Sequence, residues 1–226
     1  VHYHRAVKTT YEQRCLHRAN RRAIVGHAAA RQAFLDGASE FEIHLAYMKA
    51  CQHLENELPY VSIVCQNENG SCLHYRQKSR ERPGRGQNYA LTIDAGAQVD
   101  GYVSDITRSH AGSPDDFSDL IAALDKEQQH IVSCARPGIP YADLNRIAHQ
   151  KIAGLLHDFG FVDLAVDSIV ENRISNVFFP HGVGHFIGLQ VHDSGGFMQS
   201  PDGRVQAAPE EYPALRAASA FEYMPS

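Results

Sequence analysis

The fold is decided by residues 89–109, which read Tyr89-Ala-Leu-Thr-Ile-Asp-Ala-Gly-Ala-Gln-Val-Asp-Gly-Tyr-Val-Ser-Asp-Ile-Thr-Arg-Ser109. Apolar and polar residues alternate on both sides of Asp100-Gly101, a dipeptide typical of a two-residue hairpin turn. We therefore predict an antiparallel hairpin whose strands are Tyr89–Ala95 and Tyr102–Ser109.

The same register places two aspartates of this hairpin on one face. If Asp100-Gly101 is the turn, Asp94 lies opposite Thr107, and Asp105 is two residues from Thr107 on the same strand. Diagonal neighbours of this kind lie about 7–8 Å apart at Cα, whereas a one-residue slip would put them on opposite faces. Two acids among apolar strand residues are unfavourable unless a positive charge, such as a divalent cation, compensates them. The pair is compatible with a metal site and equally with a surface or turn role.

Helices are expected on both sides of the hairpin. Apolar spacing predicts a helix from about Thr10 to Leu35. The run Ser39-Glu-Phe-Glu42 has the pattern of a capping box and begins a second helix, which extends to about Leu54. Two later helices are predicted at about Asp116–Ala135 and Tyr141–Phe159.

A weak internal repeat relates the two parts of the chain. The first part contains helix, Gly37, helix and strands, with strands predicted at Val61–Gln66 and Ser71–Tyr75 before the hairpin. The second contains helix, Gly138, helix and a strand-like segment near Val177. This order predicts an α+β fold in which helices cover one face of a mostly antiparallel sheet. We expect two pseudo-equivalent halves, of which the second is incomplete.

A second informative stretch is rich in glycine and contains three histidines: Phe178-Phe-Pro-His-Gly-Val-Gly-His-Phe-Ile-Gly-Leu-Gln-Val-His-Asp193. Its glycine spacing differs from a dinucleotide fingerprint, and it lacks the HExxH pattern of helical zinc proteases. Neutral imidazole is a common metal ligand, so His181, His185 and His192, taken with the two aspartates, favour a metal site. Taken alone, His74 is interpreted as a structural residue.

Two motifs resemble those of the pita-bread (creatinase/aminopeptidase-like) metallopeptidases: the hairpin motif from Asp94 to Arg108 and the histidine motif from His181 to Asp193. Within that superfamily the chain is similar to the branch of prolidases (Xaa-Pro dipeptidases) and organophosphorus acid anhydrolases. Three shorter segments match that branch as well: Asn67-Glu-Asn69, Leu73-His-Tyr75 and residues 195–199. The resemblance covers nearly the whole chain and implies one pita-bread catalytic domain over residues 1–226.

The resemblance also implies an activity and a set of site residues. The family hydrolyses dipeptides that end in proline at a site with two divalent metal ions, for which we expect Mn²⁺, with Co²⁺ or Zn²⁺ as alternatives. By the resemblance, Asp94 is a chelating ligand of one metal, Asp105 a bridging ligand and His185 the imidazole ligand. The side chains implied to line the pocket, hold the substrate or stabilise charge on the attacked carbonyl are His74, His181 and His192.

The sequence departs from the family pattern near its C-terminal end. The family has two further glutamate ligands, in Glu-Pro-Gly and Ile-Glu-Asp contexts, and neither context occurs here. Glu222 is the available substitute, but it aligns with the approach to the expected strand. We therefore expect a catalytic domain truncated at both ends, without the small N-terminal domain and the last strands of prolidases, whose metal site is only partly occupied.

Two other functions are compatible with the same residues. A catalytically inactive relative that keeps the fold to bind a partner would explain the missing glutamates. A methionine aminopeptidase relative would share the ligands, but it fits the flanking motifs poorly. A Ser-His-Asp site is not supported because the chain has no GxSxG elbow.

Composition excludes several classes of protein. The chain has 226 residues, 43% of them hydrophobic and 21% charged, which is incompatible with intrinsic disorder. A formal charge of −5 argues against nucleic acid as the main partner, and the sequence has no apolar run long enough for a membrane span. Five scattered cysteines and first residues without an apolar core favour a cytoplasmic protein. Strands left open at the sheet edge, and the resemblance to prolidases, predict a homodimer.

Overall fold

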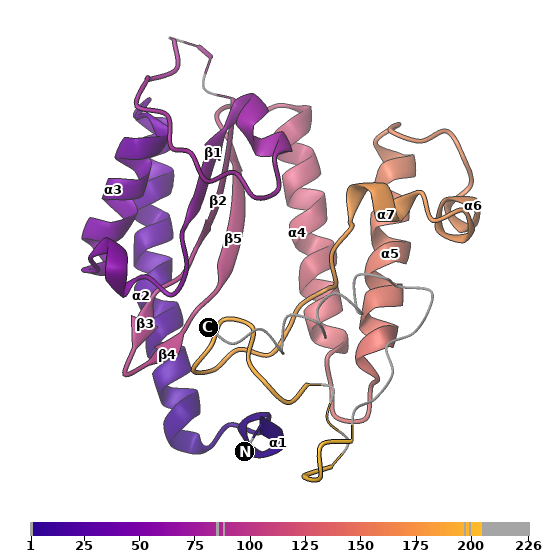
Figure 1. The fold of residues 1–226 in the computed structure, drawn as a ribbon. Coiled ribbons are helices and arrows are strands. Elements are labelled where there is room, and N and C mark those ends of the chain that lie inside the picture. Colours follow the sequence, from indigo (N-terminus) through magenta and orange to yellow (C-terminus); the bar gives the residue numbers. More distant parts are fainter. Residues whose placement is uncertain (1, 85, 88, 197, 199, 205–226) are drawn as a thin grey trace. The chain divides into compact units, whose positions relative to one another are not determined.

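A computed structural model describes residues 2–84, 86–87, 89–196, 198 and 200–204 (Figure 1). The chain divides into two compact units. Among the described residues, unit 1 comprises those within 2–115 and 186–203, and unit 2 comprises 116–185 with residue 204.

Unit 1 is built on a three-stranded antiparallel sheet. Its strands are β1 (Ile63–Gln66), β2 (Ala90–Ala95) and β5 (Ile106–Ala111), in the order β1-β2-β5. The hairpin continues beyond β2 and β5 as the short pair β3 (Gln98–Val99) and β4 (Tyr102–Val103).

The turn of the hairpin has the predicted geometry. Asp100 and Gly101 both have positive φ, 53° and 83°, as a type I′ turn requires. Asp94 pairs with Thr107, so the register predicted from the sequence is confirmed.

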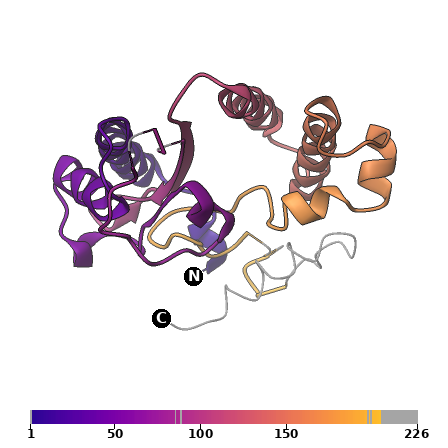
Figure 2. The same cartoon turned by 90° about the horizontal axis from the view of Figure 1, so that it is seen from above.

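Two helices cover one face of this sheet, α2 (Thr10–Leu35) and α3 (Glu40–Cys51) (Figures 1 and 2). Each begins with a capping box, and the one at Ser39 was predicted from the sequence. Gly26 lets the two helices approach closely, because a Cβ there would lie 2.7 Å from the ring of Tyr47. The fully buried side chains between helices and sheet include Phe34, Ile43, Tyr47, Val64, Leu91 and Ile93.

Alternation along β2 explains which face is covered. Leu91, Ile93 and Ala95 are buried in the core, while Thr92 and Asp94 lie on the opposite face and are only half-buried. Burying an aliphatic side chain contributes roughly 1.5–3 kcal/mol. A register slip of one residue would therefore exchange two buried aliphatic side chains for a threonine and an aspartate.

The strand predicted at Ser71–Tyr75 is wrong. Residues Asn67–Ser71 form the 3-10 helix η2, and the segment that follows has no regular secondary structure. The physical reason is a tertiary contact: residues of this segment donate hydrogen bonds to the buried carboxylate of Glu40 rather than to a neighbouring strand. A second 3-10 helix, η1 (Glu55–Glu57), and a short helix α1 (His2–Arg5) complete the elements of unit 1.

Unit 2 is helical. Helices α4 (Asp116–Cys134) and α5 (Tyr141–Asp158) lie side by side, and α6 (Val166–Glu171) and α7 (Ser175–Phe178) pack against α5 (Figure 1). The strand-like segment predicted near Val177 is wrong, since these residues form α7, where buried Ser175 hydrogen-bonds to His149 over 3.0 Å. Between residues 116 and 185, all of which the structure describes, no strand is formed.

Within the described residues, no helix combines the length and the apolar character that crossing a bilayer requires.

Several histidines are buried in a way that favours their neutral form. Burial lowers the pKa of His27, His44 and His149, and it lowers the pKa of His110 to about 4. The positive charge of Arg31 lowers the pKa of His110 further. Protonation of these side chains is therefore easier in the unfolded chain, where a histidine has a pKa of about 6.5.

We predict that the free energy of unfolding is constant above about pH 6.5 and decreases as the pH falls towards 4. In this window the unfolded chain takes up protons that the folded chain excludes. Each such proton contributes about 1.4 kcal/mol per pH unit. Urea denaturation between pH 4 and pH 8 measures the slope.

His110→Gln should reduce the slope of the unfolding free energy against pH by the contribution of about one proton. His130→Gln, which changes an exposed histidine on α4, is the matched control and should leave the slope unchanged. Equal slopes for His110→Gln and the unsubstituted protein would contradict the assignment.

Candidate metal centre

Asp94 and Asp105 meet at a single phenol. The hydroxyl of Tyr60 hydrogen-bonds to Asp94 Oδ1 at 2.6 Å and to Asp105 Oδ1 at 2.9 Å. Asp94 is on β2, and Asp105 lies directly before β5, so the two carboxylates come from the two arms of the hairpin. The sequence-based prediction that the two aspartates share one face is confirmed.

The charges of this pair are only partly compensated. Burial raises the pKa of Asp94, and the nearby charge of Asp105 raises it further, whereas the hydrogen bond from Tyr60 lowers it. Burial and the two carboxylates raise the pKa of the Tyr60 phenol far above its usual range, so the phenol stays protonated. A neutral phenol supplies a hydrogen-bond donor but no positive charge. A divalent cation would supply that charge.

Tyr60 was not identified from the sequence. It follows Pro59 in the segment before β1 and reaches the hairpin because Gly96 has no side chain. A Cβ at Gly96 would lie 2.7 Å from Pro59 Cγ and 2.8 Å from Tyr60 Cε1. The glycine directly after β2 was the available signal, since a close backbone approach is a common reason for glycine at such a position.

Two hydrogen bonds fix the hairpin where β2 passes into β3. The N–H of Ser104 donates to the carbonyl of Ala97 at 2.8 Å, and the N–H of Ala97 donates to Ser104 Oγ at 2.9 Å. Both residues are buried. These bonds fix the backbone next to Asp105, so the carboxylate is held by rigid structure on both strands.

The four predicted histidines are distributed over the two units. His74 and His192 belong to unit 1, and His181 and His185 belong to unit 2. All four are exposed. Their proposed contributions to the metal site and the substrate pocket stay predictions.

Two ion pairs hold the side chain of Asp193, the residue after His192. Asp193 is 4% exposed and forms ion pairs with Arg5 and with Lys8, the latter at 2.8 Å. Lys8 also lies over the ring of Phe186, 5.1 Å from its centroid. The N-terminal segment thus holds residues 186–193 of unit 1 in place.

The donor set fits a divalent metal ion at the aspartates. Two half-buried carboxylates that face one hydroxyl provide oxygen ligands, which hard divalent cations prefer. Over the part of the chain that the structure describes, no group of three or more His, Cys, Asp or Glu side chains is arranged to hold a metal. The two aspartates are the candidate ligands that the structure brings together in unit 1. Glu222, the substitute considered from the sequence, lies outside the described residues.

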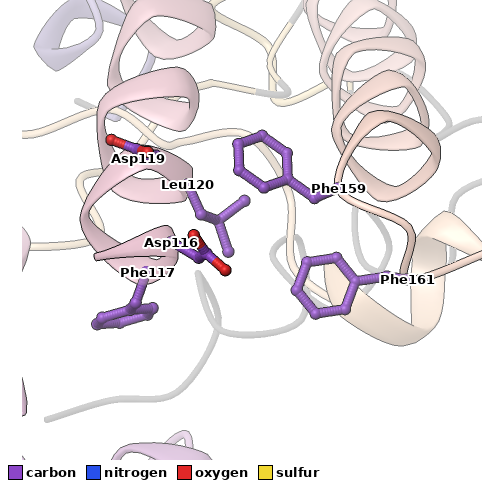
Figure 3. A pocket seen from close by; sticks show the side chains of 6 residues that line it. All are labelled: Asp116, Phe117, Asp119, Leu120, Phe159 and Phe161. Carbon is purple, nitrogen blue, oxygen red and sulfur yellow. The ribbon is translucent and has the colours of Figure 1, made fainter.

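Unit 2 contains a pocket that includes none of the predicted site residues (Figure 3). Leu120, Phe159 and Phe161 provide apolar side chains, and Asp116 lies beside them. Its remaining lining residues are Phe117 and Asp119. The pocket lacks the histidines that the predicted chemistry needs.

Relatives with known names match almost the whole chain. It is 50% identical over 222 residues to a protein of Aeromonas hydrophila subsp. hydrophila named Xaa-Pro dipeptidase, with 98% of this chain and 50% of the relative covered. A protein of Shewanella woodyi with the same name is 50% identical over 216 residues, with 96% and 49% covered. The chain thus spans about half the length of the curated relatives it matches.

Solved structures of Escherichia coli aminopeptidase P have the same fold. The low pH form superposes with a TM-score of 0.78 at 25% identity, covering 93% of this chain and 52% of that chain. A zinc-substituted form in complex with product gives 0.77 at 26% identity, covering 91% and 47%. The predicted pita-bread fold of class α+β is confirmed by these likenesses. The family model for metallopeptidase family M24 matches residues 14–217, and the chain therefore belongs to that family.

Proposed function

We propose that the full-length protein is a prolidase-like metallopeptidase that hydrolyses Xaa-Pro dipeptides with two divalent metal ions. The observation that carries this proposal is the meeting of Asp94 and Asp105 at the hydroxyl of Tyr60. The names of the relatives at 50% identity support the substrate class. The zinc-substituted form of a structural neighbour supports the use of divalent metals. Among these we propose Mn²⁺, with Co²⁺ or Zn²⁺ as alternatives.

Asp94, Asp105 and His185 are the residues that would hold the metal ions. Bound divalent ions supply Lewis-acid polarisation of the scissile carbonyl and a nucleophile at neutral pH. The protein's part is to fix the ligands, and the single hydroxyl of Tyr60 does so by lying within hydrogen-bond distance of both aspartates, which share its proton. We assign His74, His181 and His192 to the pocket, where imidazole N–H groups would hold the substrate and stabilise charge on the attacked carbonyl.

We also propose that the protein is cytoplasmic and forms a homodimer. All five cysteines are free thiols, as expected in a reducing compartment. The free thiols support only the location.

The second candidate function is a catalytically inactive binding protein. Such a protein would keep the fold and the paired aspartates to bind a partner without hydrolysing peptide. The two functions differ in whether peptide is hydrolysed once metal is supplied.

The first prediction from this proposal concerns activity. The full-length protein, supplied with Mn²⁺, should hydrolyse Xaa-Pro dipeptides, and Asp105→Asn should reduce kcat/KM by more than about 100-fold, beyond the usual effect of losing an outer-shell partner. The amide keeps the size of the side chain but loses the charge. Asp100→Asn is the matched control, since Asp100 lies in the exposed turn and Asn tolerates its positive φ.

Three outcomes decide between the candidates. Cleavage of Xaa-Pro that is lost in Asp105→Asn and kept in Asp100→Asn supports the prolidase-like function. Cleavage of peptides with an initiator methionine but not of Xaa-Pro would point to an aminopeptidase instead. No hydrolysis of either class, with metal bound, would favour the binding protein.

The second prediction concerns metal binding by residues 1–226 alone. We expect well under two equivalents of Mn²⁺ per chain after dialysis, because residues 1–226 contain neither of the two further glutamate contexts that the resemblance implies. Elemental analysis measures the ratio. Two tightly held equivalents would show that further ligands, such as Glu222 or a group from a second subunit, complete the site.

A further inference from the structure

Glu40 is a buried carboxylate that the proposed metal chemistry does not use. It is the first residue of α3, and it is 1% exposed. Its Oε1 accepts hydrogen bonds from the N–H of Gln66 and from Asn69 Nδ2, both at 2.8 Å. Its Oε2 accepts from the hydroxyl of Tyr75 and from the N–H of Ser79, also at 2.8 Å.

The chemistry of this site requires a carboxylate. All four partners are donors, and an ionised carboxylate offers two oxygens with about four acceptor sites and no donor. The N-terminal end of α3 also stabilises a negative charge at this position. A glutamine would have the same size, but its amide hydrogens would face donors on one side.

These bonds determine the shape of residues 69–79. The segment has no regular secondary structure after η2, so no helical or strand hydrogen bonds of its own fix its conformation. Instead, Asn69 and Ser79, at the two ends of the segment, hydrogen-bond to the carboxylate of Glu40, and Tyr75, between them in sequence, binds the same carboxylate. Asn69 Nδ2 also lies 3.1 Å from the Tyr75 hydroxyl, and the N–H of Phe41 donates to the carbonyl of Ser79 at 3.0 Å.

The segment held in this way carries His74, which directly precedes Tyr75. We infer that Glu40 is a positioning residue for His74, acting through the hydroxyl of Tyr75 and the backbone of Ser79. The inference rests on the role that the proposed function gives to His74. Asn69, Tyr75 and Ser79 all bind the same buried carboxylate, which reduces the number of conformations open to the segment that carries His74.

The test compares Glu40→Gln and Tyr75→Phe in the full-length protein with Tyr102→Phe. Tyr102 is the matched control because its hydroxyl also donates to a carboxylate, Glu12 Oε1 at 3.0 Å, away from the 69–79 segment. The first readout is the NMR signal of the His74 ring, which does not depend on activity. The second is kcat and KM for a Xaa-Pro dipeptide.

We expect Tyr75→Phe and Glu40→Gln to shift or broaden the His74 signal and to lower kcat/KM by about tenfold or more. Tyr102→Phe should change neither. A His74 signal that is unchanged in Tyr75→Phe would overturn the inference, and so would a loss of kcat/KM no larger than in the control. If the unsubstituted protein hydrolyses no Xaa-Pro dipeptide, the proposed function fails, and the His74 signal still decides whether Glu40 positions this residue. Should Glu40→Gln not fold, Tyr75→Phe alone gives the answer.

Discussion

The candidate site depends on one constraint, the pairing of Asp94 with Thr107 across the β2–β5 hairpin. The turn at Asp100-Gly101 sets this register, and the bonds between Ala97 and Ser104 maintain it. The helices enforce it from the other side, because only this register directs the aliphatic residues of β2 into the core. The same packing that stabilises unit 1 therefore directs both carboxylates to the opposite face.

Local patterns predicted the parts of the fold that local interactions determine. The hairpin register and α2 follow from turn chemistry and apolar spacing, and the structure confirms both. The strand that was predicted wrongly and the site residue that was missed both depend on contacts between residues far apart in sequence. The strand predicted at Ser71–Tyr75 does not form, because Tyr75 binds the carboxylate of Glu40, 35 residues away in sequence. Such a distant bond leaves no local pattern in the sequence. Tyr60 likewise meets aspartates 34 and 45 residues away, and no motif marks it.

Buried Glu40 and the half-buried pair Asp94 and Asp105 illustrate the difference between a structural carboxylate and the carboxylates that we propose as metal ligands. Glu40 accepts four hydrogen bonds at 2.8 Å, so its charge is well solvated by the protein. Asp94 and Asp105 share one phenol, and burial raises the pKa of Asp94. The incomplete compensation at the aspartates supports our proposal that a cation binds there. The complete compensation at Glu40 suits it to holding a segment in place.

We propose that the hairpin presents Asp94 and Asp105 as ligands of the same divalent ion. The most direct measurement is the anomalous difference map of crystals of the full-length protein grown with Mn²⁺. We expect a manganese peak that contacts a carboxylate oxygen of each aspartate, on the sheet face opposite α2 and α3. Manganese bound only at other residues, or the two carboxylates on opposite faces of the sheet, would contradict it.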